Sequence, residues 1–205
     1  MWQSLCISKK MVQRMERVNL FRSDFFVSRV GNEDQITNLK QQMLVSHENN
    51  VDEIANSNDN CWRSTVKYNG IDWLLNGVKE LAEEAIDYYS NLDSTFKEHI
   101  VERHINLDYW SNINKPASKN VLHSHVADSF AAVYYIQGTK TGPLKFINPA
   151  NVLNDCNTIS PFVREVLVHP HDGELILWPA WVPHEVEVNQ SDRDRMNIAF
   201  TLQVT

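Results

Sequence analysis

The first half of the chain combines one strand-like pattern with two helical ones. Residues 19–29 place aromatic or apolar side chains between polar ones, which predicts a strand. Apolar residues recur at spacings of three and four over residues 33–46 and, more regularly, over residues 71–89, so each stretch predicts a helix. Residues 47–63, between these helices, are polar and rich in Asn and Asp, and we expect a loop there.

After Ser94 the pattern changes to short apolar stretches separated by turn signals. The predicted strands cover residues 105–114, the stretch around His123 and His125 that leads into residue 136, and residues 144–148, 164–170, 174–180, 184–188 and 195–204. Many short strands without intervening helices favour a sandwich or a jelly roll. We therefore expect an α+β, mainly β fold in which the N-terminal helices pack on one face.

Length and composition fit one folded domain. A chain of 205 residues can bury a full core, and 42% apolar with 22% charged residues excludes disordered and fibrous classes. No apolar run approaches the roughly 18 residues that a membrane-spanning helix needs, so no membrane partner is expected. We expect residues 1–18, which carry four basic side chains, to be an N-terminal extension of a single domain over residues 19–205.

Net charge and cysteine content restrict the expected binding partners and cellular compartment of the protein. A net charge of −7 argues against nucleic acid as a partner. The three cysteines lie far apart and form no CxxC pair, which favours reduced thiols over a disulfide framework. The N-terminus lacks the apolar segment of a signal peptide, so we expect a cytoplasmic protein.

Two histidines separated by one residue, His123 and His125, are the first candidate for chemistry. In an extended strand both imidazoles project to one side, and imidazole suits Fe, Zn, Cu and Ni. The pair alone also fits a surface strand with two solvated histidines. His184, about sixty residues further on, follows a strand directly, and a jelly roll brings two such stretches to one open end. Three ligands there would leave three octahedral positions, as in non-haem Fe(II) oxygenases.

Arg195 begins the last apolar strand and shares a strand face with Asn197, while Met196 points to the other face. An inward arginine is costly unless it meets an anion. Because a guanidinium binds a carboxylate in a two-point fork, a dicarboxylate co-substrate is the natural partner. Arg193, two residues earlier, fits a solvated turn instead.

Five stretches together resemble the 2-oxoglutarate/Fe(II)-dependent oxygenase superfamily, and most closely a family of such oxygenases found in bacteria and phages. They read HSHV, AAVYYI, GPLKF, PHDGELILWPAWVPHEV and RMNIAFT, in the order and spacing of that family. The resemblance starts near residue 20 and is tight from Trp110 onward. It implies a double-stranded β-helix of cupin-like form, with its core at about residues 105–205. It also implies a hydroxylase that uses O2 and couples conversion of 2-oxoglutarate to succinate and CO2 with oxidation of a substrate.

Carried over residue by residue, the resemblance implies iron ligands at His123, His125 and His184. Arg195 would hold the distal carboxylate of 2-oxoglutarate, and Tyr135 would bond the same carboxylate. Asn112 is a further residue that can point into the site, and Trp181 would brace the turn before His184.

One departure concerns the second ligand, because most of the superfamily has a carboxylate where His125 stands. Asp128 is the nearby carboxylate, and on a continuous strand it faces away from His125. It completes the triad only if the strand ends at His125 and the chain turns.

The substrate class that the resemblance implies is a small molecule or an amino-acid side chain, in the cytoplasm of a bacterium or a phage-infected host. A homodimer is compatible with the sequence. Two rival functions stay open: a three-His, cupin-like metalloenzyme that does not use 2-oxoglutarate, such as a thiol dioxygenase, and a non-catalytic jelly-roll binding module. Arg195 and Tyr135 argue against the first, and an uncompensated buried arginine argues against the second. His169 and His171 lie near a turn and are expected to be solvated.

Overall fold

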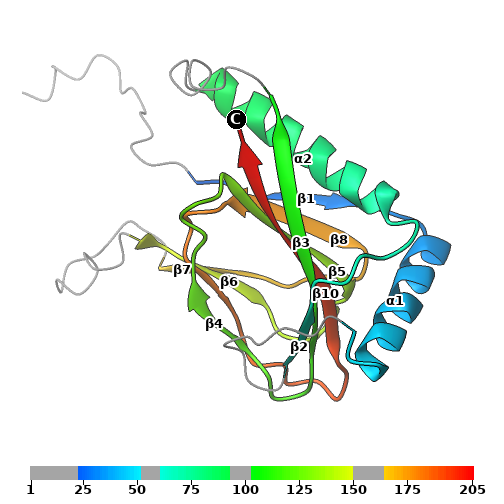
Figure 1. Ribbon diagram of the computed structural model, residues 1–205. Coiled ribbons are helices and arrows are strands. Elements are labelled where there is room, and N and C mark those ends of the chain that lie inside the picture. The colour runs from blue at the N-terminus through cyan, green and yellow to red at the C-terminus, as the bar shows by residue number, and fades with distance from the viewer. Residues whose placement is uncertain (1–22, 52–60, 93–102, 150–163) are drawn as a thin grey trace, which may run out of the picture.

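The computed structural model describes residues 23–51, 61–92, 103–149 and 164–205. These residues form two helices and ten strands (Figure 1). The helices are α1 (Glu33–Glu48) and α2 (Asp72–Leu92). The strands are β1 (Phe26–Arg29), β2 (Cys61–Ser64), β3 (Ile105–Asn114), β4 (Asn120–His123), β5 (Phe130–Gln137), β6 (Leu144–Ile147), β7 (Glu165–Val168), β8 (Glu174–Pro179), β9 (His184–Val186) and β10 (Arg195–Val204).

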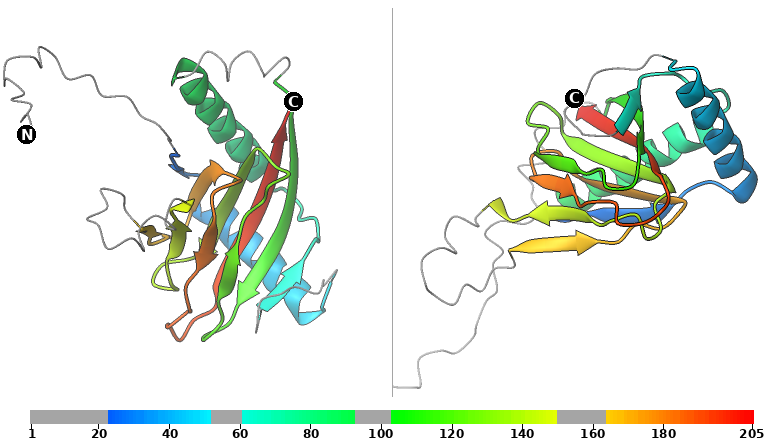
Figure 2. Two further views of the ribbon diagram at one scale, coloured as in Figure 1. Left: turned by 90° about the vertical axis from the view of Figure 1, so that its left-hand side faces the viewer. Right: turned by 90° about the horizontal axis from the view of Figure 1, so that it is seen from below.

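Two antiparallel sheets face each other. The larger one has the strand order β1-β8-β5-β10-β3-β2, and the smaller one has the order β4-β9-β6-β7. Figure 2 shows both helices on the outer side of the larger sheet, away from the smaller sheet. The architecture is the predicted double-stranded β-helix with helices on one face.

Each face of the larger sheet buries a different set of side chains. On β5, Ala132 and Tyr134 belong to the core under the helices, whereas Val133 and Tyr135 belong to the core between the sheets. Because both faces of the strand are covered, β5 is apolar almost throughout rather than alternating. The helices contribute a stripe of residues at spacings of three and four, among them Leu74, Val78, Leu81 and Ala85.

The predicted helices match α1 and α2 to within three residues at each end, and the last predicted strand matches β10 at both ends. The prediction of one strand through the histidine pair is wrong. β4 ends at His123, a turn follows, and β5 begins only at Phe130, so His125 lies beyond the strand.

The loop predicted over residues 47–63 is also wrong in part. Cys61–Ser64 pairs with β3 as a short edge strand, and α1 continues to Glu48. Residues 52–60 and the predicted N-terminal extension, residues 1–18, lie outside the described residues. Of the strand predicted over residues 19–29, residues 26–29 form β1, residues 23–25 are not in a strand, and residues 19–22 lie outside the described residues.

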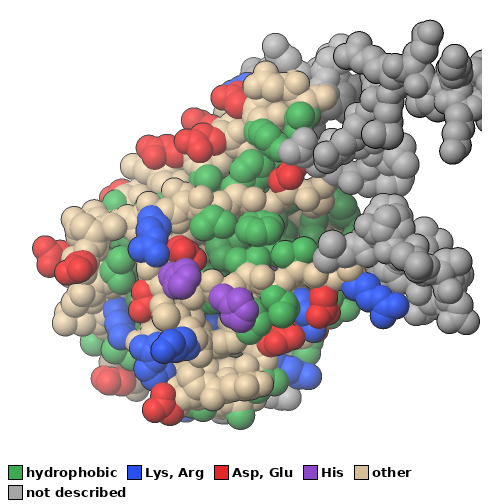
Figure 3. All heavy atoms as spheres, turned by 180° about the vertical axis from the view of Figure 1, so that it is seen from behind, with side chains coloured by type: hydrophobic (Ala, Val, Ile, Leu, Met, Phe, Trp, Pro, Cys, Tyr) green, Lys and Arg blue, Asp and Glu red, His purple; other side chains and the backbone are tan. Residues whose placement is uncertain are grey.

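Some apolar side chains reach the surface. Viewed from behind, hydrophobic side chains form an area bordered by acidic and basic ones (Figure 3). Phe25, Val27, Val166 and Trp181 are among the exposed large apolar residues. No helix within the described part of the chain is long and apolar enough to cross a membrane.

Candidate metal centre

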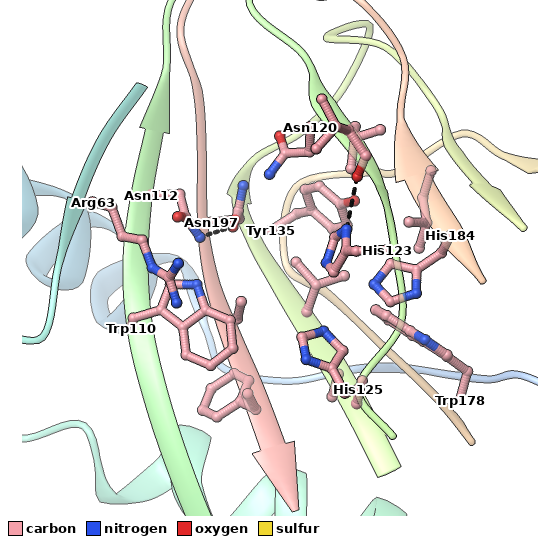
Figure 4. Close-up of a pocket in the computed structure, with 18 residues that line it drawn as sticks. Arg63, Trp110, Asn112, Asn120, His123, His125, Tyr135, Trp178, His184 and Asn197 are labelled. Atoms are coloured by element: carbon pink, nitrogen blue, oxygen red, sulfur yellow. Dashed lines mark hydrogen bonds between the residues drawn. The ribbon is translucent and has the colours of Figure 1, made fainter. Parts of the chain in front are cut away.

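Three histidines meet where the smaller sheet approaches the larger one (Figure 4). His123 ends β4 and His184 begins β9, and the two residues are direct partners across these neighbouring strands. His125 lies two residues past the end of β4. Its backbone N–H donates to the carbonyl of Ala180 at 2.9 Å, which ties this short segment to the end of β8. Pairing and one backbone hydrogen bond therefore hold all three rings together.

The three rings are close enough to share one metal ion. One ligand nitrogen from each lies within 4.8 Å of the others, and the ring centroids are 4.3 Å (His123–His184), 5.0 Å (His123–His125) and 5.4 Å (His125–His184) apart. The chain does turn after His125, since the N–H of Asp128 donates to the carbonyl of His125 at 3.2 Å. Among the described residues the cluster nevertheless contains His125 and not Asp128.

Two of the rings present a defined nitrogen to the centre. Nδ1 of His123 lies 2.7 Å from the carbonyl oxygen of Val121, and Nδ1 of His184 lies 2.9 Å from that of Val182. A carbonyl oxygen only accepts, so each Nδ1 carries the proton and donates it. Nε2 of each ring then keeps its lone pair for a metal, as in the usual second hydrogen bond of a metal-binding histidine.

Burial favours the neutral form of two of the imidazoles, those of His184 and His125. Burial lowers the pKa of His184 to about 3; its bond to Val182 opposes this shift, and the other two histidines add to it. Burial also lowers the pKa of His125, and His123 lowers it further. Because a metal binds the neutral ring, the site is preset for a cation at neutral pH.

An aromatic wall backs His184. The ring of Trp178 meets that of His184 edge to face at 4.8 Å, and Phe146 lies behind at 6.4 Å. The sequence pointed to Trp181 as the bracing residue, but Trp181 is 47% exposed. The bracing contact comes from Trp178, three residues earlier, which lies on the inner face of β8.

A cavity of about 220 Å³ opens beside the cluster, between the two sheets. On the larger sheet it is lined by a polar row of direct cross-strand partners: Tyr135 on β5, Asn197 on β10, Asn112 on β3 and Arg63 on β2. Nδ2 of Asn112 donates to Oδ1 of Asn197 at 3.0 Å, as drawn in Figure 4. Asn112 therefore lies at the site, as the sequence indicated.

Arg195 lies on the same sheet face but behind the cavity wall. Its side chain is 0% exposed, and it is not among the lining residues. Its terminal nitrogens donate to the carbonyl oxygens of Thr141 (3.0 Å) and Glu187 (3.4 Å) and to Oδ1 of Asn120 (2.9 Å). Asn120 itself lines the cavity, so one amide separates the guanidinium from the space beside the histidines.

The charge of Arg195 has no acidic partner among the described residues, and its Nε is buried without a hydrogen bond there. Burial lowers the pKa of Arg195, while the nearby Tyr135 and Cys61 raise it. Tyr135 is 1% exposed, and burial raises the pKa of its phenol to about 12 against the opposing influence of Arg195. The predicted roles of Arg195 and Tyr135 toward a carboxylate stay predictions.

Among the lining residues, Arg63, Trp110, Asn120, Trp178 and Asn197 were given no role at the site by sequence reasoning. Arg63 fell in the predicted loop, so no face could be assigned to it. Alternation along residues 105–114 places Trp110 on the same strand face as Asn112, and alternation along residues 195–204 places Asn197 on the same face as Arg195. The sequence therefore contained the signal that assigns Trp110 and Asn197 to the inner face.

Part of the chain matches the model of a known family. Residues 108–201 match the model of the family described as "Putative 2OG-Fe(II) oxygenase". This segment is a 2OG-Fe(II) oxygenase domain. The three clustered histidines lie within this segment, and the match confirms the predicted resemblance to 2OG-Fe(II) oxygenases, while the metal and carboxylate roles read from the motif pattern stay predictions. A search of curated proteins finds no matching sequence.

Solved structures share the fold of this 2OG-Fe(II) oxygenase domain. An α-ketoglutarate-dependent carbocyclase of nogalamycin biosynthesis, SnoK, is 12% identical, with 88% of this chain and 79% of that chain covered and a TM-score of 0.65. A prolyl-4-hydroxylase from Pseudomonas putida is 15% identical, with 87% and 91% covered and a TM-score of 0.60. HygX from Streptomyces hygroscopicus, solved with nickel, 2-oxoglutarate and hygromycin B, is 12% identical, with 89% and 84% covered and a TM-score of 0.56.

The family and fold indicate a 2-oxoglutarate-dependent oxygenase, an oxidoreductase whose cofactors are Fe(II) and 2-oxoglutarate. The donor set fits such a metal, since neutral imidazole is a good ligand for iron and two of the three rings have a free Nε2. The buried, unpaired charge of Arg195 fits an anion nearby.

Proposed function

We propose that this protein is a hydroxylase in which His123, His125 and His184 hold Fe(II) and the cavity beside them takes 2-oxoglutarate. The observation that carries the proposal is the convergence of three imidazoles at the edge of a cavity with a buried arginine, which has no acidic partner among the described residues, behind its wall. The substrate is a small molecule or an amino-acid side chain. Solved structures of this fold include a prolyl-4-hydroxylase and an enzyme bound to hygromycin B, which supports that range.

The co-substrate end of the cavity is the one beside Tyr135 and Asn120. The distal carboxylate of 2-oxoglutarate would be received there, close to the charge of Arg195 and to the phenol of Tyr135. A carboxylate so placed would supply the anion that the buried guanidinium lacks. Oδ1 of Asn120 accepts a hydrogen bond from Arg195 in the structure. The Asn120 side chain would therefore have to move before the carboxylate could contact the guanidinium.

The bound iron and 2-oxoglutarate together supply the oxidising chemistry that removes hydrogen from a C–H bond of the substrate. The protein's own residues orient the bound groups and shield the site from water. The hydrogen bond between Asn112 and Asn197 fixes the middle of the polar row, and Trp178 with Phe146 keeps water from the buried side of His184.

The three-His metalloenzyme that does not use 2-oxoglutarate is the second candidate. The all-imidazole cluster favours it, because no described carboxylate shares the site. It gives no reason for a buried arginine next to Tyr135, and we therefore place it second.

The test is Fe(II)-dependent formation of succinate from 2-oxoglutarate in air, followed by NMR. Wild-type protein should form succinate slowly without added substrate, and His184→Ala should form none. His169→Ala removes an exposed histidine outside the cluster and should match the wild type. Iron-loaded wild-type protein that forms no succinate would favour the second candidate.

A further inference from the structure

A second cation faces the cavity from the side opposite to His184. Arg63, on β2, is the one lysine or arginine among the residues that line it, and no aspartate or glutamate lines it. The guanidinium carbon of Arg63 lies 4.5 Å from the centre of the Trp110 ring, so the head group is stacked rather than free to swing. The structure thus holds a positive charge in place at this side of the cavity.

The charge of Arg63 has no partner within the described residues. No ion pair joins it to a carboxylate there, and its Nε is buried without a hydrogen bond. Arg63 is partly buried, and burial lowers its pKa, while the nearby Cys61 raises it. Such a group is costly unless a ligand brings the missing acceptor.

One molecule of 2-oxoglutarate does not serve both ends of the row. Tyr135, Asn197, Asn112 and Arg63 lie on four adjacent strands, so the backbones of Tyr135 and Arg63 are three strand spacings, roughly 14 Å, apart. In the proposed function, 2-oxoglutarate lies between the histidines and the end of the row at Tyr135 and Asn120, which leaves the end at Arg63 to another ligand. We therefore take the anion at Arg63 to be a different one.

Arg63 is nevertheless close to the metal ligands. The ring of Trp110, under its guanidinium, lies 6.3 Å from the ring of His125, and the charge of Arg63 is one of the influences that lower the pKa of His125. Next to Trp110 the inner sheet face continues with Ala199 and Val133, which are cross-strand partners. An anion held by Arg63 would thus place an attached hydrocarbon along an apolar strip beside the histidines.

We propose that Arg63 and Trp110 form the substrate-recognition site and that the substrate is a small molecule carrying a carboxylate. This inference rests on the proposed function. The guanidinium offers a planar two-point fork that matches a carboxylate. A phosphate, with its larger charge, is matched less well, because Arg63 is the single cation lining the cavity. Arg63 is then a specificity-determining residue, and Trp110 is the platform that positions it.

The test observes the arginine Nε–H groups directly by ¹H–¹⁵N NMR, in full-length protein loaded with Zn(II) and 2-oxoglutarate. Zn(II) is redox-inert, so no turnover disturbs the titration. Arg63→Gln assigns the Arg63 signal by its loss, and Arg195→Met assigns that of Arg195. The probes are acetate, as the simplest carboxylate, and acetamide, as its neutral counterpart of the same shape.

We expect acetate to shift the Arg63 signal in a saturable way and acetamide to leave it in place. Arg63→Lys keeps the positive charge but loses the two-point fork, and its binding of acetate is followed by the indole N–H signal of Trp110. The acetate concentration that half-saturates the shift of this signal should be at least tenfold higher than in the wild type. Arg29→Gln removes one positive charge from an exposed side chain outside the cavity and should leave the titration as in the wild type.

An Arg63 signal that stays still in acetate, responds equally to both probes, or moves only together with Arg195 would overturn the inference. Failure of the proposed function would look different, because the Arg195 signal would then not respond when 2-oxoglutarate is first added. The acetate titration reads Arg63 independently of that result.

Discussion

His184 is fixed in three ways before any metal binds. It pairs across strands with His123, its Nδ1–H donates to the carbonyl of Val182 in the turn before β9, and the ring of Trp178 packs against it. The sequence motif was sufficient to select the three histidines, because their spacing fits two strands that a jelly roll brings together. It did not reveal what holds His125, because the hydrogen bond to Ala180 joins segments that only the fold makes neighbours.

The surroundings of Arg195, behind the cavity, could likewise be predicted only in part. Alternation along the last strand places Arg195 on the inner face, and the structure agrees. Alternation cannot show that Asn120 would stand between that arginine and the cavity, because Asn120 comes from the opposite sheet.

Cys61, the partner of Asn114 at the end of β2, gives a prediction on reactivity. Burial raises the pKa of its thiol from 9.0 to about 11, although Arg195 and Arg63 each lower it. The thiolate is the nucleophile, so Cys61 should react with iodoacetamide at pH 8 roughly a hundredfold more slowly than a free thiol. Its rate should keep rising about tenfold per pH unit up to about 11.

The measurement is peptide-resolved alkylation of the native protein, with glutathione as the free-thiol control. A rate that levels off near pH 9 would contradict the prediction.

At the scale of elements, the long regular patterns were predictable and the short edge strand β2 was not. The helices α1 and α2 follow their own apolar periodicity, and β10 alternates over its full length. β2 has four residues in a polar region, and what makes it a strand is pairing with β3, about fifty residues away in the chain. Tertiary pairing, rather than local propensity, decides such a segment.

The turn between β1 and α1 offers a test of how closely the helices are fitted to the sheet. Gly31 has φ +85°, and a Cβ there would lie 2.5 Å from the Trp73 ring. Gly70 also has a positive φ, +66°, but a Cβ there would meet nothing within 4 Å. Backbone strain of about 1–2 kcal/mol is common to both substitutions, whereas overpacking adds about 1–3 kcal/mol only at Gly31.

We therefore expect Gly31→Ala to lower the free energy of unfolding by about 2–5 kcal/mol and Gly70→Ala by about 1–2 kcal/mol, in urea titrations. Equal losses would show that Trp73 moves aside freely.

The whole molecule is a sandwich whose binding space lies between the two sheets, with a cation near each end of the polar row that crosses the larger sheet. Ligands bound there contact both sheets and should stabilise the fold through linkage. At a concentration of 2-oxoglutarate about a hundredfold above its Kd, the gain is about 2.7 kcal/mol, or an increase in Tm of about 5–10 °C for a domain of this size.

Arg195→Met should lose most of this increase in the Zn(II)-loaded protein. The Tm of the variant without 2-oxoglutarate is its own baseline, because the substitution also removes the hydrogen bonds to Thr141, Glu187 and Asn120. Differential scanning calorimetry with and without 2-oxoglutarate measures both quantities. A full thermal shift in Arg195→Met would exclude this arginine from co-substrate binding.

The most direct test of the central claim is anaerobic titration of 2-oxoglutarate into Fe(II)-loaded protein, followed by its visible charge-transfer absorption. The wild type and His171→Ala, an exposed histidine outside the cluster, should both develop the band. His184→Ala should show none, and Arg195→Met should need at least tenfold more 2-oxoglutarate. A wild-type protein that binds iron but develops no band would contradict the account.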